Sequence, residues 1–513
     1  MKGIPDWIYV SGFSFVLIGI MFMIQGHVGI NLADEGFLWY GAAHTSIGEV
    51  PLLDFQSYDP GRYYWAALWF KIFGNTDIIT LRIAALLFLW IGLTCALLAV
   101  RRVTKSWGYL FVIGTLLMVW VYPRHKMFDI SISMIAVSII ILLLDKPKPV
   151  RYVWSGMAVG LAAFFGINHG LYSAVSVALA SLYIFFKIDR TNPIKKMGGV
   201  AIGILIGYSP MLLMFAFVPG FLKRYVEMII WLFRLGNTNI PLPIPWPWRV
   251  DFGQLQAMDI VSGLIVGFLF LLVLLFPAAG IIHSFASKKT NLYLAASAFA
   301  GLPYAYVAYS RADLGHLAQG IYPLLLGACF WALQYFKLSR VRITLCMTAM
   351  LAVSFLSVGK VQPLYQLIQA PPNAFVKFTL TNNDLSIDAY SANFIRTVQD
   401  IKAQYLKGDE TLFIAPHTPT LYPILDLKSP LRDIYLLFPE TEERQREQIE
   451  ELNQKNAALV ILGDNALDGR DELRFRNTHP ILWEYLNNDY EAIAVEALPP
   501  NYTVLRRVDT ATR

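Results

Sequence analysis

Residues 31–71 read NLADEGFLWYGAAHTSIGEVPLLDFQSYDPGRYYWAALWFK, and this stretch decides how the rest of the chain is interpreted. It lies between two long apolar segments, yet it carries acidic and basic side chains from Asp34 to Lys71. Charged side chains are costly inside a bilayer, so we expect a polar, aromatic-rich loop of this length to lie on one membrane face.

The composition is that of a membrane protein. The chain has 513 residues, of which 56% are hydrophobic and 15% are charged, whereas about a quarter of the residues in soluble domains are charged. Windows of about 20 apolar residues predict an α-helical polytopic protein with about eleven transmembrane helices. The expected spans are 7–30, 77–100, 107–122, 127–144, 153–167, 168–186, 197–217, 260–285, 291–309, 317–336 and 343–359.

Basic residues predict the orientation of these spans. Lys and Arg gather in alternate short loops, which the positive-inside rule assigns to the cytoplasm; these loops lie at 101–105, 146–151, 187–196, 288–289 and 337–342. The 31–76 loop and the C-terminal tail are then expected outside. Since no small-residue cleavage site follows the first apolar segment, we interpret it as an uncleaved anchor. The expected location is a bacterial inner membrane, with the exported parts in the periplasm.

The composition changes near residue 360 to that of a soluble domain. Strand patterns alternate with helix patterns, which predicts a small periplasmic α/β domain with a partly parallel sheet. We therefore divide the chain into a transmembrane catalytic domain, 1–359, and a periplasmic domain, 360–513. No glycine-rich phosphate loop opens a helix, so no nucleotide is expected. The net charge of +6 is attributed to loops facing anionic lipid, and no nucleic-acid partner is expected. The expected strands are 412–415, 458–462, 492–495 and 503–505, and the expected helices are 391–405 and 440–456.

The distribution of charge points to chemistry at the outer face. Few ionisable residues fall near the centres of the predicted spans, where ion-coupled transporters usually place them. Transfer of a sugar from a polyprenyl phosphate suits this arrangement, because the leaving phosphate is already stable as an anion. Such a site needs a carboxylate to take the proton of the acceptor hydroxyl and a cation to pair with the phosphate.

Several motifs resemble those of the GT-C superfamily of polyprenyl-phosphate-sugar glycosyltransferases, in the branch with protein O-mannosyltransferases and aminoarabinose transferases. The resemblance covers most of the chain, and it implies that the acidic residue opening the first outer loop, here Asp34, is the catalytic base. The protein mannosyltransferases have His-Pro-Pro where this chain has Asp59-Pro60-Gly61, so a protein acceptor is not implied. The motifs are Asp34-Glu35, Leu53-Asp54-Phe55, Asp59-Pro60-Gly61, Arg62-Tyr63-Tyr64, Phe73-Gly74 and Leu81-Arg82.

Each candidate residue also has a structural alternative. Asp34 could instead cap a helix; Asp54 is the second candidate base, and Glu35 either orients the site or is a solvated loop residue. Four cations are candidate ligands of the lipid phosphate, or alternatively snorkel to lipid headgroups: Arg62, Arg124, Lys126 and Arg311. His316 is a further candidate or a structural histidine, and Trp246 either stacks on a sugar or anchors the chain at the interface.

These observations predict an inverting glycosyltransferase that moves a sugar from a polyprenyl-phosphate donor to a cell-envelope glycan or lipid on the periplasmic face. The expected partners are the lipid-linked sugar, a lipid or polysaccharide acceptor and membrane lipids. No metal site is assigned, although carboxylates alone could bind Mg²⁺ or Ca²⁺. The alternative from another class is a flippase or transporter of lipid-linked sugars. A membrane anchor without catalysis would need far fewer spans.

Overall fold

The structure is a computed structural model that describes residues 5–236, 239–253, 256–336, 339–381 and 383–508. Part of the basic loop 337–342 considered above falls outside these ranges. The chain forms two compact units. We call Met1–Gly26 with Arg82–Ile368 the helical unit, and His27–Leu81 with Gln369–Arg513 the mixed unit.

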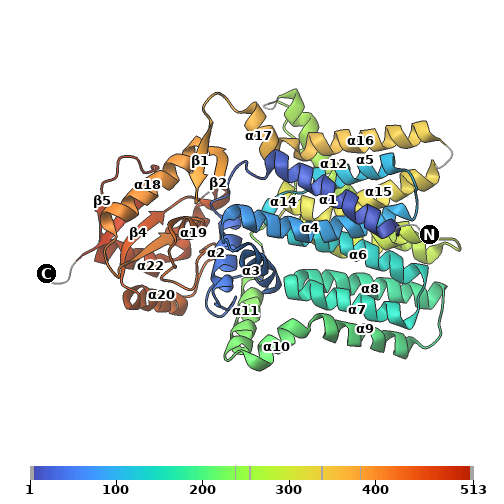
Figure 1. The fold of residues 1–513 in the computed structure, drawn as a ribbon, viewed down its shortest axis with the longest axis horizontal. Helices are drawn as coiled ribbons and strands as arrows, with labels where there is room; N and C mark the ends of the chain where they lie inside the picture. The colour runs from blue at the N-terminus through green and yellow to red at the C-terminus, as the bar shows by residue number, and fades with distance from the viewer. Residues whose placement is uncertain (1–4, 237–238, 254–255, 337–338, 382, 509–513) are drawn as a thin grey trace. The chain divides into compact units, whose positions relative to one another are not determined.

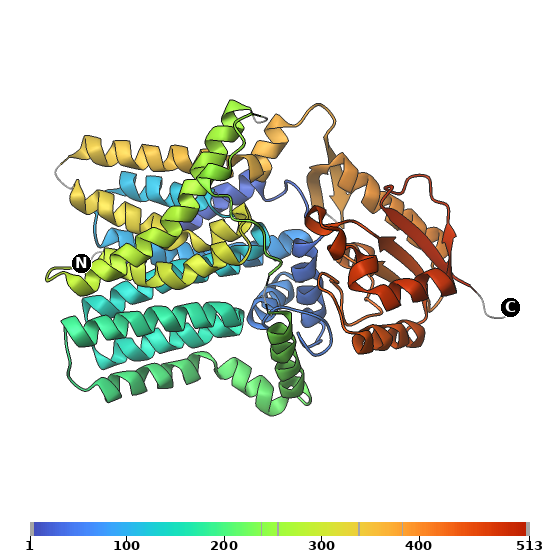
Figure 2. The same ribbon diagram turned by 180° about the vertical axis from the view of Figure 1, so that it is seen from behind.

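The helical unit is built from α1 and from the helices α4 to α17 (Figure 1). The long helix α12 is seen along its length in Figure 2. The helices are α1 (Asp6–Gln25), α4 (Ile78–Arg101), α5 (Trp107–Val119), α6 (Met127–Asp145), α7 (Pro149–Phe165), α8 (Ile167–Lys187), α9 (Pro193–Gly207), α10 (Ser209–Phe217), α11 (Phe221–Leu235), α12 (Ala257–Ala286), α13 (Leu292–Ser310), α14 (Leu314–Gly320), α15 (Tyr322–Tyr335), α16 (Arg340–Val358) and α17 (Pro363–Gln369).

Each of the eleven expected spans coincides with a helix or with a bent pair of helices. Among the described residues, six helices are long and apolar enough to cross a membrane, and two bent pairs, α9 with α10 and α14 with α15, raise the number to eight. The remaining three expected spans are α5 with 13 residues, α7 with 17, and α13, which is rich in Ala and Tyr. The chain is therefore a polytopic helical membrane protein, with fewer full-length spans than the apolar windows predict.

The two adjoining expected spans, 153–167 and 168–186, correspond to α7 and α8, which are separated by a break at Gly166. Helix α7 also packs closely against α9. A Cβ atom added to Gly203 would lie 2.1 Å from the carbonyl oxygen of Val153, and one added to Gly207 would lie 2.1 Å from that of Met157. Only glycine permits this approach of two helix backbones, as at small-residue interfaces of membrane helices generally.

In the mixed unit, the first outer loop folds into two helices, α2 (Asp34–Ser46) and α3 (Gly61–Phe73). Helix α3 buries Tyr63 and Phe70 and leaves Leu68 and Ile72 about half exposed. It ends at Gly74, whose positive φ of 66° suits glycine.

The C-terminal part of this unit contains two sheets. A hairpin pairs β1 with β2, and a four-stranded sheet has the order β3-β4-β6-β5, in which β3 and β4 are parallel and the other pairs are antiparallel. Every residue of central strand β4 is buried. The predicted partly parallel sheet is confirmed, whereas the β1–β2 hairpin was not predicted. The elements are β1 (Phe375–Leu380), β2 (Asn383–Asp388), α18 (Ala389–Tyr405), β3 (Thr411–Ala415), α19 (Leu421–Leu425), α20 (Glu442–Gln454), β4 (Ala457–Gly463), α21 (Phe475–Thr478), α22 (Pro480–Asp489), β5 (Tyr490–Ile493) and β6 (Tyr502–Arg507).

The first loop and the C-terminal segment fold together within the mixed unit. Ser386 of β2 donates its backbone N–H to the carbonyl of His27 at 2.9 Å and accepts from the N–H of Gly29 at 2.7 Å. Farther along the loop, Lys428 pairs with Glu49 at 2.6 Å. The loop that carries the candidate acids thus shares a compact body with residues more than 300 positions away.

Candidate functional site

Asp34 is the first residue of α2. A carboxylate at this position is stabilised by the free N–H groups and the positive end of the helix dipole. The hydroxyl of Tyr435, from the C-terminal segment, donates a hydrogen bond to Asp34 Oδ1 at 3.3 Å. The candidate base is therefore part of a network that reaches across the mixed unit.

The other two candidate acids sit in different surroundings. Glu35 is only 3% exposed, and its Oε2 accepts the backbone N–H of Asn31 at 3.2 Å, which fixes the turn before α2. Asp54 is exposed, and its Oδ2 accepts the backbone N–H of Val50 at 2.7 Å. Leu52, which lies in the turn between Val50 and Asp54, has a φ of 71°. Asp54 thus closes its own turn, whereas Glu35 fixes Asn31 in the turn that precedes the candidate base Asp34.

His417 was not a sequence candidate, yet it lies in this part of the mixed unit. Its ring meets that of Tyr435 edge to face, with the centroids 6.3 Å apart. Burial lowers the pKa of His417 to about 4, against the opposing influence of the Asp34 and Asp468 charges. His417 is accordingly neutral near pH 7.

Arg62, in the first turn of α3, is 4% exposed. Its guanidinium carbon lies 4.9 Å from the centroid of the Tyr58 ring, which is a cation–π distance. Tyr58 in turn packs edge to face on Phe37 of α2, at 4.9 Å between centroids. Arg62 is thereby tied to the helix that begins with Asp34.

In the helical unit, the candidates Arg311 and His316 both contact the carboxylate of Asp313. Arg311 Nε donates to Asp313 Oδ2 at 2.7 Å, and Asp313 Oδ1 accepts the backbone N–H of His316 at 2.9 Å, which caps α14. The His316 ring nitrogen Nδ1 also lies 2.9 Å from the same oxygen. Burial opposes ionisation of Asp313, but His316 and Arg311 prevail and lower its pKa to about 2. Arg311 also donates to the carbonyl of Ile240 at 3.1 Å.

Arg124 and Lys126 form the short 3₁₀ turn η1 (Arg124–Lys126) before α6. Arg124 donates to the carbonyl of Gln25 at 3.4 Å, and Lys126 Nζ lies 3.9 Å from Asp129 Oδ2.

Asp129 belongs to a buried polar cluster of three helices. Its Oδ1 is 3.0 Å from Nε2 of His169, whose Nδ1 is 3.3 Å from the Tyr304 hydroxyl. Lys126 is therefore placed beside a buried acid.

Trp246 lies just before the short turn η2 (Pro247–Arg249). Its ring stacks on Trp248 at 5.3 Å and 13°, and Trp248 is 69% exposed. Tyr309 lies 6.1 Å from Trp246. Trp246 itself is partly buried, and a stacked indole pair with one exposed ring suits either a lipid interface or the face of a sugar ring.

Sequence reasoning found the acids and cations but overlooked their partners. The spacing of Lys126 to Asp129 and of Asp313 to His316, three residues in each pair, was a usable signal for a local ion pair. Nothing in the sequence linked Tyr435 or His417 to Asp34. Among the described residues, no group of three or more His, Cys, Asp or Glu side chains is arranged to hold a metal ion.

No family model matches the sequence, and neither does any curated protein. Solved structures do match. ArnT from Cupriavidus metallidurans bound to undecaprenyl phosphate has a TM-score of 0.50 at 12% identity, covering 98% of each chain. Its apo form has a TM-score of 0.50 at 11% identity, covering 98% of this chain and 97% of that one.

The oligosaccharyltransferase of Archaeoglobus fulgidus, in its apo form, is also similar, with a TM-score of 0.47 and 10% identity over 98% of this chain and 76% of that one. The match to ArnT covers nearly the whole of both chains, so it includes the helices and the C-terminal mixed sheet domain. The chain therefore has an ArnT-like fold.

Proposed function

We propose that this protein is an inverting glycosyltransferase that takes a sugar from a polyprenyl-phosphate donor and transfers it to a glycan or lipid of the cell envelope on the periplasmic face of the inner membrane. The observation that carries the proposal is Asp34, an acid at the start of α2, held by a hydroxyl donor from a remote segment of a chain with an ArnT-like fold.

The fold supports a lipid-linked donor. The similar ArnT structure was solved with undecaprenyl phosphate bound, which is a polyprenyl phosphate without its sugar. Such a donor suits a protein whose bulk is apolar helix, because the lipid tail stays in the bilayer while the sugar is presented in water.

The chemistry proposed for Asp34 is that of a general base. The acceptor hydroxyl oxygen forms a bond to the anomeric carbon while the bond from that carbon to the phosphate oxygen breaks. Asp34 takes the hydroxyl proton, and polyprenyl phosphate leaves with the bonding electron pair. Because the leaving group is a stable anion, no second carboxylic acid is needed, in contrast to glycoside hydrolysis.

Phosphate recognition falls to cations of the chain. Arg311 is the best organised of the candidates, because Asp313 and the Ile240 carbonyl hold its guanidinium in one orientation. Arg62, Arg124 and Lys126 are the further candidates. His316 supports the same turn through Asp313. Trp246 is proposed for contact with the sugar.

The test measures sugar transfer from a synthetic polyprenyl-phosphate sugar by purified protein, comparing Asp34→Asn with Asp54→Asn. Loss of a general base lowers turnover by about 100- to 10,000-fold, and we expect this for Asp34→Asn. Asp400→Asn, an exposed change on α18, is the matched control. If Asp54→Asn loses turnover while Asp34→Asn keeps it, the base is Asp54.

The same preparation separates transfer from transport. In vesicles that contain donor but no acceptor, a glycosyltransferase leaves the donor intact and on its original side. Passage of intact donor across these vesicles, with no transfer when acceptor is added, would overturn the proposal in favour of a flippase. Addition of EDTA to the active enzyme tests whether Mg²⁺ or Ca²⁺ takes part.

A further inference from the structure

The start of α2 is pressed against one residue of the C-terminal segment. Thr420 donates from its hydroxyl to the carbonyl of Asn31 at 2.9 Å and from its backbone N–H to the carbonyl of Leu32 at 3.2 Å. A Cβ atom added to Gly36 would lie 2.3 Å from the Thr420 Cα. The backbones of Gly36 and Thr420 are therefore in direct contact. Because of this contact and the two hydrogen bonds, the position of the turn before Asp34 depends on Thr420.

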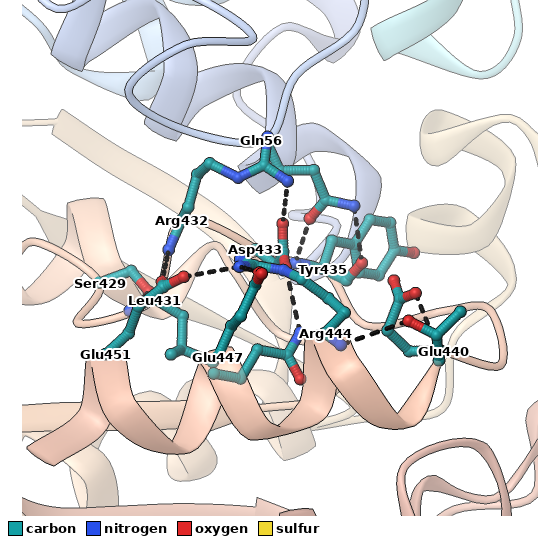
Figure 3. Close-up of polar contacts among 12 residues, drawn as sticks. Gln56, Ser429, Leu431, Arg432, Asp433, Tyr435, Glu440, Arg444, Glu447 and Glu451 are labelled. Carbon is teal, nitrogen blue, oxygen red and sulfur yellow. Dashed lines mark hydrogen bonds and ion pairs between the residues drawn. The ribbon is translucent and has the colours of Figure 1, made fainter. Parts of the chain in front are cut away.

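Tyr435, the residue whose hydroxyl reaches Asp34, is itself held in two ways. Its backbone N–H donates to Gln56 Oε1 at 2.9 Å, and Gln56 Nε2 donates back to its carbonyl at 3.1 Å. Its ring packs against Phe37 of α2 at 5.5 Å. Figure 3 shows Gln56 and Tyr435 facing each other, with both polar ends of the amide engaged.

A buried charge network lies along the same segment (Figure 3). Asp433 accepts from Arg444 Nε at 2.8 Å and from Gln448 Nε2 at 3.0 Å, both on α20. The neighbouring Arg432 donates from its backbone to Glu451 at 3.0 Å and from its guanidinium to the Leu52 carbonyl. The residues before Tyr435 are thus fixed to α20 on one side and to the first loop on the other.

We propose that Tyr435 is a positioning residue for the candidate base: its hydroxyl orients the Asp34 carboxylate, while Thr420 fixes the turn that carries it. This inference rests on the proposed function. It makes the C-terminal segment a part of the catalytic apparatus. A donor to a carboxylate restricts its rotamer and favours its ionised form, which is the form that accepts a proton.

The first test is Tyr435→Phe, which keeps the ring contacts and removes the hydroxyl. We expect kcat to fall roughly three- to tenfold, in line with loss of one ordinary side-chain hydrogen bond, with the donor KM little changed. Tyr485→Phe is the matched control, since Tyr485 donates to Asn453 on an exposed part of the same unit.

The second test compares Thr420→Ala with Thr420→Ser. Serine keeps a hydroxyl that can donate to the Asn31 carbonyl, as threonine does. We therefore expect Thr420→Ser to retain most of the kcat that Thr420→Ala loses. If the wild type is active and both Tyr435→Phe and Thr420→Ala match its kcat and its donor KM, this inference alone is overturned. A wild type that turns over no polyprenyl-phosphate sugar would instead overturn the proposed function.

Discussion

The candidate base and the best-ordered candidate cation are held in opposite ways. In the mixed unit, Asp34 receives its hydrogen bond from Tyr435, 401 residues farther along the chain. In the helical unit, Arg311 is fixed by Asp313, two residues away, and His316 uses the same carboxylate. The cation takes its charged partner from its own turn and adds one contact to the Ile240 carbonyl, whereas the hydrogen bond from Tyr435 to the acid forms when two distant segments fold together.

This difference predicts different sensitivities. A local ion pair survives as long as its turn forms, and a long-range contact is lost whenever either segment loosens. Changes far from Asp34 should therefore reach it through the mixed unit, while Arg311 should respond to changes in its own turn. The following variants test each side of the comparison.

The largest effect is expected from Asp433→Asn. Asp433 is buried, and its pKa lies below the usual value because Arg432 and Arg444 outweigh the burial that would raise it. Removing one partner of a buried ion pair costs roughly 3–5 kcal/mol. We expect residues 369–513 to become susceptible to proteolysis at a clearly lower temperature, and turnover to fall with them.

Asp471→Asn is the control for this variant, because the pair of Asp471 with Arg474 is on the surface and such pairs contribute little. Equal protease resistance of Asp433→Asn and wild type would show that the network around Asp433 does not support the 429–435 segment.

A smaller effect is expected from pH. His479 is 1% exposed, and burial lowers its pKa to about 4. An unfolded histidine binds a proton near pH 6.5, so between pH 6.5 and 4 the unfolded state binds more protons and the mixed unit loses stability as pH falls. The loss from this one group is about 2–4 kcal/mol. His479→Gln should flatten the fall in unfolding temperature between pH 7 and 4.5.

The turn at Arg311 provides the contrast in the same experiment. Asp313 has a pKa of about 2, below the ordinary value of 3.8, so its stabilising contribution is present above pH 3.8 and is lost only as pH falls towards 2.

If the unfolding temperature of His479→Gln falls as steeply as that of wild type, the pH sensitivity has another source.

The smallest effect is expected from Asp313→Asn. The asparagine oxygen can still cap α14 by accepting the His316 N–H, but the charge that orients Arg311 is gone. We expect the donor KM to rise roughly three- to tenfold, as for loss of one charge-assisted hydrogen bond, with kcat nearly unchanged. Steady-state kinetics with varied donor measures this split. An unchanged KM would remove Arg311 from phosphate recognition.

Much of the fold was predictable because its signals are local. Apolar runs gave every helix among the expected spans, and the break at Gly166 was visible in the sequence. The strands of the four-stranded sheet were also found. The β1–β2 hairpin and α11 were not predicted. The alternation of residues 375–388 is short and weak, and α11 mixes charged with apolar residues, so it gives no apolar window of span length.

The site was predictable only in part, for a related reason. Residue type and position in a loop indicated Asp34, Arg62 and Arg311, and close spacing could have added Asp313. Neither signal reaches Tyr435, Thr420 or His417, which meet the first loop only through folding of the mixed unit.

By itself, the sequence determined that this chain is a helical membrane protein with a small α/β domain and an acidic, aromatic first loop, because hydrophobicity and its period act over a few residues. Only the tertiary structure decided that this loop and the C-terminal segment form one compact unit and that Tyr435 faces Asp34. Such contacts depend on packing between segments hundreds of residues apart, and packing leaves no periodic trace in either segment.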